Sequence, residues 1–191
     1  MRYRPQHKVE VHRKILKGAA RRVRAEGIAG AAVSSVMRDS GLTNGGFYKH
    51  FGSKDDLLTE SLSEAFREMA DRLTQVAGKS KPGMAWKAIV KAYLSPEHCN
   101  HVESGCPLAA LAPELARADH AMQAPIRREM IKYKRRMLPL MPGRRAADKE
   151  RAFSAIFSTM IGAVAIARIL PDQAARARVL ASARDFLLRS F

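Results

Sequence analysis

The stretch that decides the fold runs from Val33 to Leu58 and reads VSSVMRDSGLTNGGFYKHFGSKDDLL. Its first apolar residues have helical spacing and predict a short helix that Gly41 closes. Thr43 is placed to cap a second short helix, which ends at Gly52. The stretch therefore predicts two short helices joined by a tight, glycine-containing turn.

The sequence on both sides of this stretch is also helical in pattern. Apolar residues repeat at helical spacing upstream and predict a helix that ends at Gly27. Ser53 to Asp56 is expected to form a capping box that starts a long helix reaching about Gly78. Further stripes with helical spacing cover 86–93, 108–115, 126–137, 153–164 and 179–187.

The composition agrees with an all-helical chain. The 31 alanines outnumber valine, isoleucine and threonine together, which favours helices over strands. We expect an all-α protein with a three-helix, helix-turn-helix domain over residues 1–53. A larger helical domain is expected over residues 54–191.

Several classes of protein are disfavoured. The longest uncharged run, residues 152–167, is shorter than the roughly 20 residues of a membrane span, so no membrane partner is expected. The basic segment 1–8 is not followed by an apolar stretch, and two cysteines make no disulfide scaffold; both point to the cytoplasm. The chain has no phosphate-cradling glycine loop, nucleophile elbow or paired-carboxylate motif, so neither an enzyme nor a cofactor is expected. The ligand-type residues at 98–106 match no standard metal site.

The net charge of +16 is unevenly distributed. Residues 1–24 carry nine basic groups and one acid, and residues 127–151 carry ten basic groups and three acids. A helix-turn-helix places a recognition helix in the major groove, so the first cluster is suited to DNA phosphates. The second cluster could face a membrane or an acidic ligand, but a solvated helix face is the favoured interpretation.

Residues 36–58 resemble the signature of the tetracycline-repressor (TetR) family, above all in the segment from Tyr48 to Leu58. The resemblance implies a homodimeric, ligand-controlled transcriptional regulator, usually a repressor that a small effector or thiol modification releases from operator DNA. Its C-terminal helices would form an effector pocket and a four-helix dimer interface, here through 152–170 and 172–189. A nonspecific basic DNA-binding protein is the alternative.

The resemblance also implies which residues meet DNA. By position these are Thr43, Asn44, Gly45, Tyr48 and Lys49, with Lys54 on a phosphate at the start of the next helix. Asn44 can pair bidentately with adenine, and the Tyr48 hydroxyl can donate to a phosphate oxygen.

Three positions in this motif need separate treatment. Ala32 stands where family members carry a capping Ser or Thr, so capping or phosphate contact is expected to fall to Ser34 or Ser35. Gly46 replaces a side chain that often touches bases, which allows closer backbone approach. His50 has two open interpretations, a phosphate contact and a local hydrogen-bond donor. We also expect the basic arm containing Arg2, Arg4 and Lys8 to follow a groove.

Residues 105–111 are similar to a helix in some electrophile- and oxidant-responsive members of the family. Cys106 is expected at a helix N-cap before Pro107, where the helix dipole lowers the pKa of a thiol. A small buried cysteine in a pocket wall is the other interpretation. The remaining candidates for the pocket of a small apolar or electrophilic effector are aromatic and methionine residues, which also suit a core: Phe66, Trp86, Tyr93, Met122, Met130 and Met160.

Overall fold

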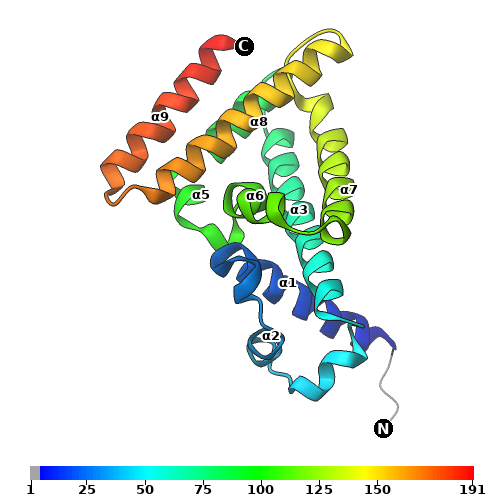
Figure 1. Ribbon diagram of the computed structural model, residues 1–191. Helices are drawn as coiled ribbons and strands as arrows, with labels where there is room; N and C mark the ends of the chain where they lie inside the picture. The colour runs from blue at the N-terminus through cyan, green and yellow to red at the C-terminus, as the bar shows by residue number, and fades with distance from the viewer. Residues whose placement is uncertain (1–4) are drawn as a thin grey trace.

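The computed structural model describes residues 5–191, and within that range it contains helices and no strand (Figure 1). The elements are α1 (Pro5–Gly30), α2 (Val33–Asp39), η1 (Asn44–Lys49), α3 (Lys54–Gly78), α4 (Ala85–Tyr93), α5 (Pro96–Asn100), η2 (Val102–Ser104), α6 (Pro107–Arg117), α7 (His120–Met137), η3 (Leu138–Leu140), α8 (Ala146–Ile169) and α9 (Gln173–Ser190), where η marks a 3₁₀ helix. The predicted all-α class is confirmed.

The N-terminal elements pack around one side of α1. Ile15, Ala19 and Val23 of α1, Met37 of α2 and Phe47 of η1 are all buried in the common core. These residues share one face of their helices because apolar residues three and four apart line up along a helix. The elements α1, α2 and η1 therefore form the predicted helix-turn-helix unit at one end of the molecule (Figure 1).

Local structure departs from prediction at two places in this unit. The helix α1 does not end at Gly27: the backbone leaves helical geometry there, with φ 79°, and the helix resumes to Gly30. The segment after Thr43 is a 3₁₀ helix, and the Thr43 side chain makes no capping hydrogen bond. Gly45 and Gly46 explain the poorer helix, since each glycine costs about 1 kcal/mol against alanine.

The long helix α3 connects the two ends of the molecule. It starts where predicted, with the Ser53 hydroxyl accepting the Asp56 N–H at 3.0 Å. Along its length α3 packs against α1, then α7 and α4. Because α3 runs from one end of the molecule into the other, the domain division at residues 53 and 54 stays a prediction.

The helices α8 and α9 lie side by side at the end away from α2 (Figure 1). Ile156, Met160 and Val164 of α8 are buried in the common core. Among the described helices, α8 alone has the length and hydropathy of a membrane span, properties that it shares with core helices of soluble proteins. Its buried face supports the role of a core helix.

Candidate nucleic-acid interface and effector site

The residues predicted to meet DNA lie on the outside of the α2–η1 unit. Phe47 points into the core, whereas the side chain of its neighbour Tyr48 is 78% exposed. The structure places the other predicted residues as follows: Ser34, Thr43, Asn44, Gly45, Lys49 and Lys54 are exposed, and Ser35, Gly46 and His50 are half-buried. The structure thus brings all ten onto one end of the protein.

An open groove of about 690 Å³ runs between the first turns of α1 and η1. Lys8 lines one side, and Thr43, Gly46, Tyr48 and Lys49 line the other. A backbone phosphate could contact both lysines and the Tyr48 hydroxyl in such a groove. Of the predicted basic arm, Lys8 takes part in this groove, while Arg2 and Arg4 lie outside the described residues.

His50 sits at the end of this groove with an unpartnered ring nitrogen. Its Nδ1 is buried and has no hydrogen-bond partner in the part of the chain that the structure describes. Burial lowers the pKa of His50, and the nearby His12, Lys8 and Lys49 lower it further. A neutral ring is therefore favoured in the free protein, and both interpretations of His50 remain predictions.

Part of the N-terminal positive charge holds the helix-turn-helix unit together. Lys14 donates to the carbonyl of Ser40 at 2.9 Å, and Arg22 pairs with Asp39 at 2.7 Å. Both contacts fix α2 and its turn against α1. The net charge of residues 1–24 therefore overstates the number of groups available to phosphate, a distinction that the sequence pattern did not reveal.

The turn itself depends on a left-handed backbone. Gly41 has φ 74°, and a Cβ built there would meet no atom within 4 Å. Glycine adopts this conformation without the steric cost that other residues bear. The prediction that Gly41 closes α2 agrees with this geometry.

The candidate pocket residues do not gather in one cavity. Phe66, Tyr93 and Met130 each line a different hollow, with volumes of about 490, 530 and 290 Å³. The remaining four divide between the core and its margin: Trp86, Cys106 and Met160 are buried in the core, and Met122 is half-buried against it. Apolar residues on a helix stripe need not line a common cavity, because the same stripes form the contacts between helices.

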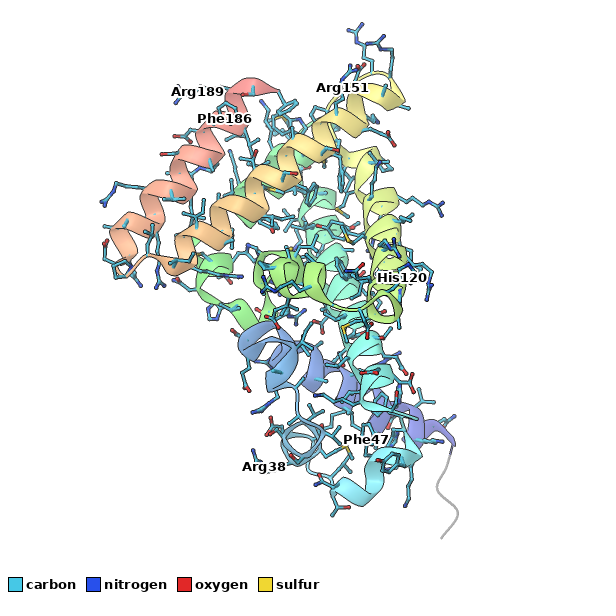
Figure 2. All side chains as sticks on the ribbon, in the orientation of Figure 1. Arg38, Phe47, His120, Arg151, Phe186 and Arg189 are labelled. Carbon is cyan, nitrogen blue, oxygen red and sulfur yellow. The ribbon has the colours of Figure 1, made fainter. Side chains whose placement is uncertain are left out.

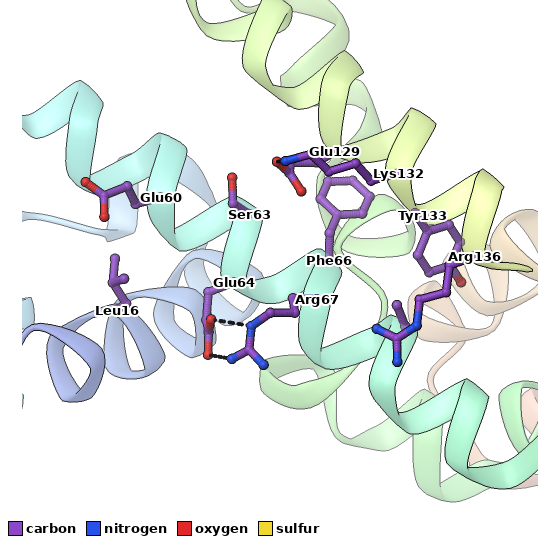
Figure 3. A pocket seen from close by; sticks show the side chains of 11 residues that line it. Leu16, Glu60, Ser63, Glu64, Phe66, Arg67, Glu129, Lys132, Tyr133 and Arg136 are labelled. Carbon is purple, nitrogen blue, oxygen red and sulfur yellow. Dashed lines mark hydrogen bonds and ion pairs between the residues drawn. The ribbon is translucent and has the colours of Figure 1, made fainter. Parts of the chain in front are cut away.

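The first of these hollows lies between α3 and α7, beside α1 (Figure 3). Phe66 and Tyr133 supply its apolar part. Charged pairs surround them, including Arg67 Nε with Glu64 at 3.0 Å and Lys132 with Glu129 at 2.7 Å (Figure 3). Such a wall combines apolar contact with polar groups that already have protein partners.

The prediction of a low pKa for Cys106 is wrong. Cys106 is the N-cap of α6 before Pro107, as expected, but its side chain is 4% exposed and makes no capping hydrogen bond. Burial raises the pKa of the Cys106 thiol, because the cost of removing a thiolate from water exceeds the stabilisation that Tyr93, the α6 backbone and Arg168 give it. Cys106 is therefore a small buried cysteine of the core.

His98 is held by the backbone on both sides of its ring. Nδ1 donates to the carbonyl of Tyr93 at 2.6 Å, and Nε2 accepts the N–H of Cys106 at 3.0 Å. Burial lowers the pKa of His98 to about 4, and protonating Nε2 would break the bond to Cys106. Both ring nitrogens are thus occupied, and residues 5–191 contain no metal-type cluster of three His, Cys, Asp or Glu.

Arg24 and Glu114 join the helix-turn-helix unit to the larger part of the chain. Buried Arg24 of α1 donates to the carbonyl of Glu103 in η2 and to the carboxylate of Glu68 on α3, both at 2.8 Å. The carboxylate of Glu114 on α6 accepts the N–H of Ile28 at 2.9 Å, directly after the kink in α1. These partners are 44 to 86 residues apart in sequence, so no local pattern signals them.

Exposed apolar residues lie on both α8 and α9. Ile166, Ile169 and Phe186 are 55, 82 and 62% exposed, and Figure 2 marks the position of Phe186 on α9. Gly162 lies on α8 with open space where a side chain would project. Exposed apolar residues beside a small residue are typical of surfaces that another helix covers.

Residues near the N-terminus match a known sequence family, and the fold of the chain resembles solved structures. Residues 15–60 match the family model of the bacterial regulatory proteins of the tetR family. No curated protein matches the chain. The resemblance to the TetR family noted in the sequence is thereby confirmed.

Solved structures with this fold include a TetR transcriptional regulator from Chloroflexus aurantiacus, 23% identical, with a TM-score of 0.77 over 96% of this chain and 95% of that one. The reduced form of NemR from Escherichia coli is 17% identical, with a TM-score of 0.69 over 94 and 96% of the two chains. FadR from Bacillus subtilis in complex with stearoyl-CoA is 16% identical, with a TM-score of 0.67 over 94 and 98%.

Proposed function

We propose that this chain, a member of the TetR family by residues 15–60 and by its fold, is a cytoplasmic homodimeric repressor that a small effector releases from its operator. The observation that carries the proposal is the exposed recognition segment 44–49 beside the basic groove. Two such segments in a dimer would read half-sites about one DNA turn apart. An effector that favours another arrangement of the two segments would lower operator affinity.

Some residues of the recognition segment would contact phosphates, and others would contact bases. Lys49, Lys54 and Tyr48 would hold phosphates, and Thr43 and the exposed Asn44 would lie nearest the base edges. Gly45 and Gly46 would let the backbone come close to the DNA. Ser34 and Ser35 at the start of α2 are placed to add phosphate contacts, and His50 remains a candidate for another.

Footprinting tests the DNA-binding part. A protected palindrome supports the repressor, whereas uniform protection supports a nonspecific basic DNA-binding protein. Lys49→Ala should weaken operator binding and reduce the slope of log affinity against log salt by about one. Lys81→Ala is the matched control, because Lys81 is exposed beyond the far end of α3. An equal salt slope for both variants would contradict this assignment.

The dimer would form through 152–170 and 172–189, which carry three exposed apolar residues. Burying Ile166, Ile169 and Phe186 against a second copy would remove three exposed apolar side chains from water. Light scattering should find a dimer that Ile169→Asp converts to a monomer. Ile131→Asp is the control, since Ile131 is 51% exposed on α7, on another helix. A monomeric parent protein would refute the interface.

Release by a small effector is better supported than release by thiol modification. Cys106 is buried and its pKa is raised, so little thiolate is available to an oxidant or an electrophile. We expect Cys106→Ser to release operator normally when the inducing compound is a ligand. Loss of release by hydrogen peroxide in Cys106→Ser alone would instead support the thiol route.

A further inference from the structure

A hollow of about 500 Å³ lies where the helix-turn-helix unit meets the larger part of the chain, and its walls come from α1, α3 and η2. Of the nine residues that line it, five are basic, three are acidic, one is a serine and none is apolar. The basic residues are Lys17, Arg21, Arg24, Arg67 and Arg72. This space is called the junction hollow below.

Arg24 holds the three walls of the junction hollow together. It donates to the Glu103 carbonyl of η2 and to the Glu68 carboxylate of α3, both at 2.8 Å. Its side chain is 1% exposed, and its Nη1 is buried with no hydrogen-bond partner among the residues that the structure describes. Burying a charged donor without an acceptor is costly, and native proteins keep few such groups. The walls are thus fixed, and one of their donors still lacks an acceptor.

Each carboxylate of the junction hollow already has a partner. The pairs are Glu68 with Arg24 at 2.8 Å, Asp71 with Arg67 at 3.1 Å, and Glu103 with the ring of His101 at 3.4 Å. A second cation, Arg136 of α7, also binds Asp71 at 2.6 Å. None of these three acids pairs with the remaining cations of the hollow.

The remaining cations are Lys17 and Arg21 of α1 and Arg72 of α3. All three are exposed, and their side chains make no ion pair and no hydrogen bond within residues 5–191. Lys17 and Arg21 are four residues apart on one helix, a spacing at which like charges face each other and repel. An anion that binds all three cations would relieve this repulsion.

The composition of the walls selects the kind of anion. Guanidinium groups bind phosphate oxygens through two parallel N–H groups, and a lysine adds a compact charge. A carboxylic acid carries an apolar body, and the junction hollow has no apolar residue to cover one. A phosphate group, which presents oxygens on every side, therefore suits these walls better than a carboxylate.

The junction hollow is distant from the residues proposed to hold DNA phosphates. Arg21 is 13 residues beyond Lys8 on α1, and Arg72 is 18 residues beyond Lys54 on α3. At a rise of about 1.5 Å per residue, these spans are about 20 and 27 Å. The separation favours a small molecule over the operator as the source of the phosphate.

We propose that the junction hollow binds a phosphate group of a small molecule. Lys17, Arg21 and Arg72 hold its oxygens, and Arg24 supplies the donor that now lacks an acceptor. The bound phosphate adds contacts between α1 of the helix-turn-helix unit and α3. Calling this molecule the effector rests on the proposed function, whereas its binding to the free protein does not.

Calorimetry with pyrophosphate tests the inference on the whole protein without DNA, with sodium chloride added to keep the ionic strength constant. We expect saturable binding of pyrophosphate and at least about tenfold weaker binding of acetate. Arg21→Gln and Arg72→Gln should each weaken pyrophosphate binding by about tenfold or more. Arg128→Gln is the matched control and should leave it unchanged, because Arg128 is an exposed arginine of α7 outside the hollow.

Three results would overturn the inference. The first is the absence of saturable pyrophosphate binding. The second is an equal loss for Arg128→Gln and Arg72→Gln, which would show attraction to the positive charge of the whole protein. The third is a loss for Lys49→Gln without a loss for Arg72→Gln, which would place the anion in the groove beside the recognition segment.

Urea denaturation shows whether the variants act through the ligand or through the fold. Arg21 and Arg72 are exposed, so without pyrophosphate both variants should keep the midpoint of the parent protein. Pyrophosphate should raise the midpoint of the parent protein and leave that of Arg72→Gln unchanged. An equal rise in both proteins would contradict the site.

Operator binding distinguishes the two sources of phosphate. In a buffer without phosphates, Arg72→Gln should keep the operator affinity and the salt slope of the parent protein. A slope smaller by about one would assign Arg72 to DNA phosphates and overturn the inference. A footprint without a protected operator would refute the proposed function and leave the pyrophosphate result standing.

Discussion

Arg24 is expected to be the most costly charged residue to replace in the N-terminal unit. Its side chain is 1% exposed and binds two acceptors on different elements, the Glu103 carbonyl and the Glu68 carboxylate. The perturbation we choose is Arg24→Met, because methionine keeps much of the apolar stem and removes only the charged head. The variant leaves both acceptors without their donor.

The size of the effect follows from the two acceptors. A hydrogen bond to a charged group contributes about 1.5–3 kcal/mol, and breaking a buried ion pair costs about 3–5 kcal/mol. The Glu68 side chain is 28% exposed and can recover some water, and the replacement also removes the unpartnered Nη1. We therefore expect Arg24→Met to lower the free energy of unfolding by about 2–3 kcal/mol.

Urea denaturation measures this change. With a slope of about 1–3 kcal/mol/M, the midpoint should fall by about 1 M or more. The control Arg21→Met, at an exposed arginine on the same helix, should change the free energy by less than about 0.5 kcal/mol. Adding Glu68→Met to Arg24→Met should restore part of the loss, because the unpaired carboxylate is gone. A change below about 0.5 kcal/mol for Arg24→Met would refute the reasoning.

Three other expectations concern single residues. The pKa of His98 is about 4 in the folded chain and 6.5 ordinarily, so the unfolded chain takes up this proton at a higher pH than the folded chain. The free energy of unfolding should therefore fall by about 3 kcal/mol as the pH drops from 6.5 to 4. In acid titrations followed by circular dichroism, a His98→Asn variant should lack this contribution. Gly41→Ala has room for its methyl but the wrong φ, so it should cost about 1 kcal/mol of stability and weaken operator binding in mobility shifts. Cys99 and Cys106 are both buried, so iodoacetamide should modify them at the rate at which the protein opens, and fast modification in the native state would contradict their burial.

Local features were predictable from sequence because their causes are local. The turn at Gly41 needs one left-handed residue, and the start of α3 needs one hydroxyl at Ser53; each is set within a few residues. The exposed side of the recognition segment follows from helical geometry. Adjacent residues of a helix point in different directions, so Tyr48 is exposed where Phe47 is buried.

Features that depend on distant parts of the chain were not predictable. The expected low pKa of Cys106 came from its helix, but the surrounding packing decides the pKa by burying the thiol. The candidate pocket residues share a chemical type and not a location, so they divide between three hollows and the core. The contacts of Arg24 and Glu114 likewise required knowing which helices meet.

The kink of α1 at Gly27 has a consequence for exchanging modules between regulators. A side chain at position 27 would approach the Glu114 carboxylate to about 3.0 Å, and that carboxylate also holds Ile28. A chimera that takes residues 1–53 from one regulator and the rest from another would separate Gly27 and Arg24 from the groups that fit them. The exchangeable module in this chain is therefore the helix-turn-helix unit together with its docking contacts at Glu68, Glu103 and Glu114.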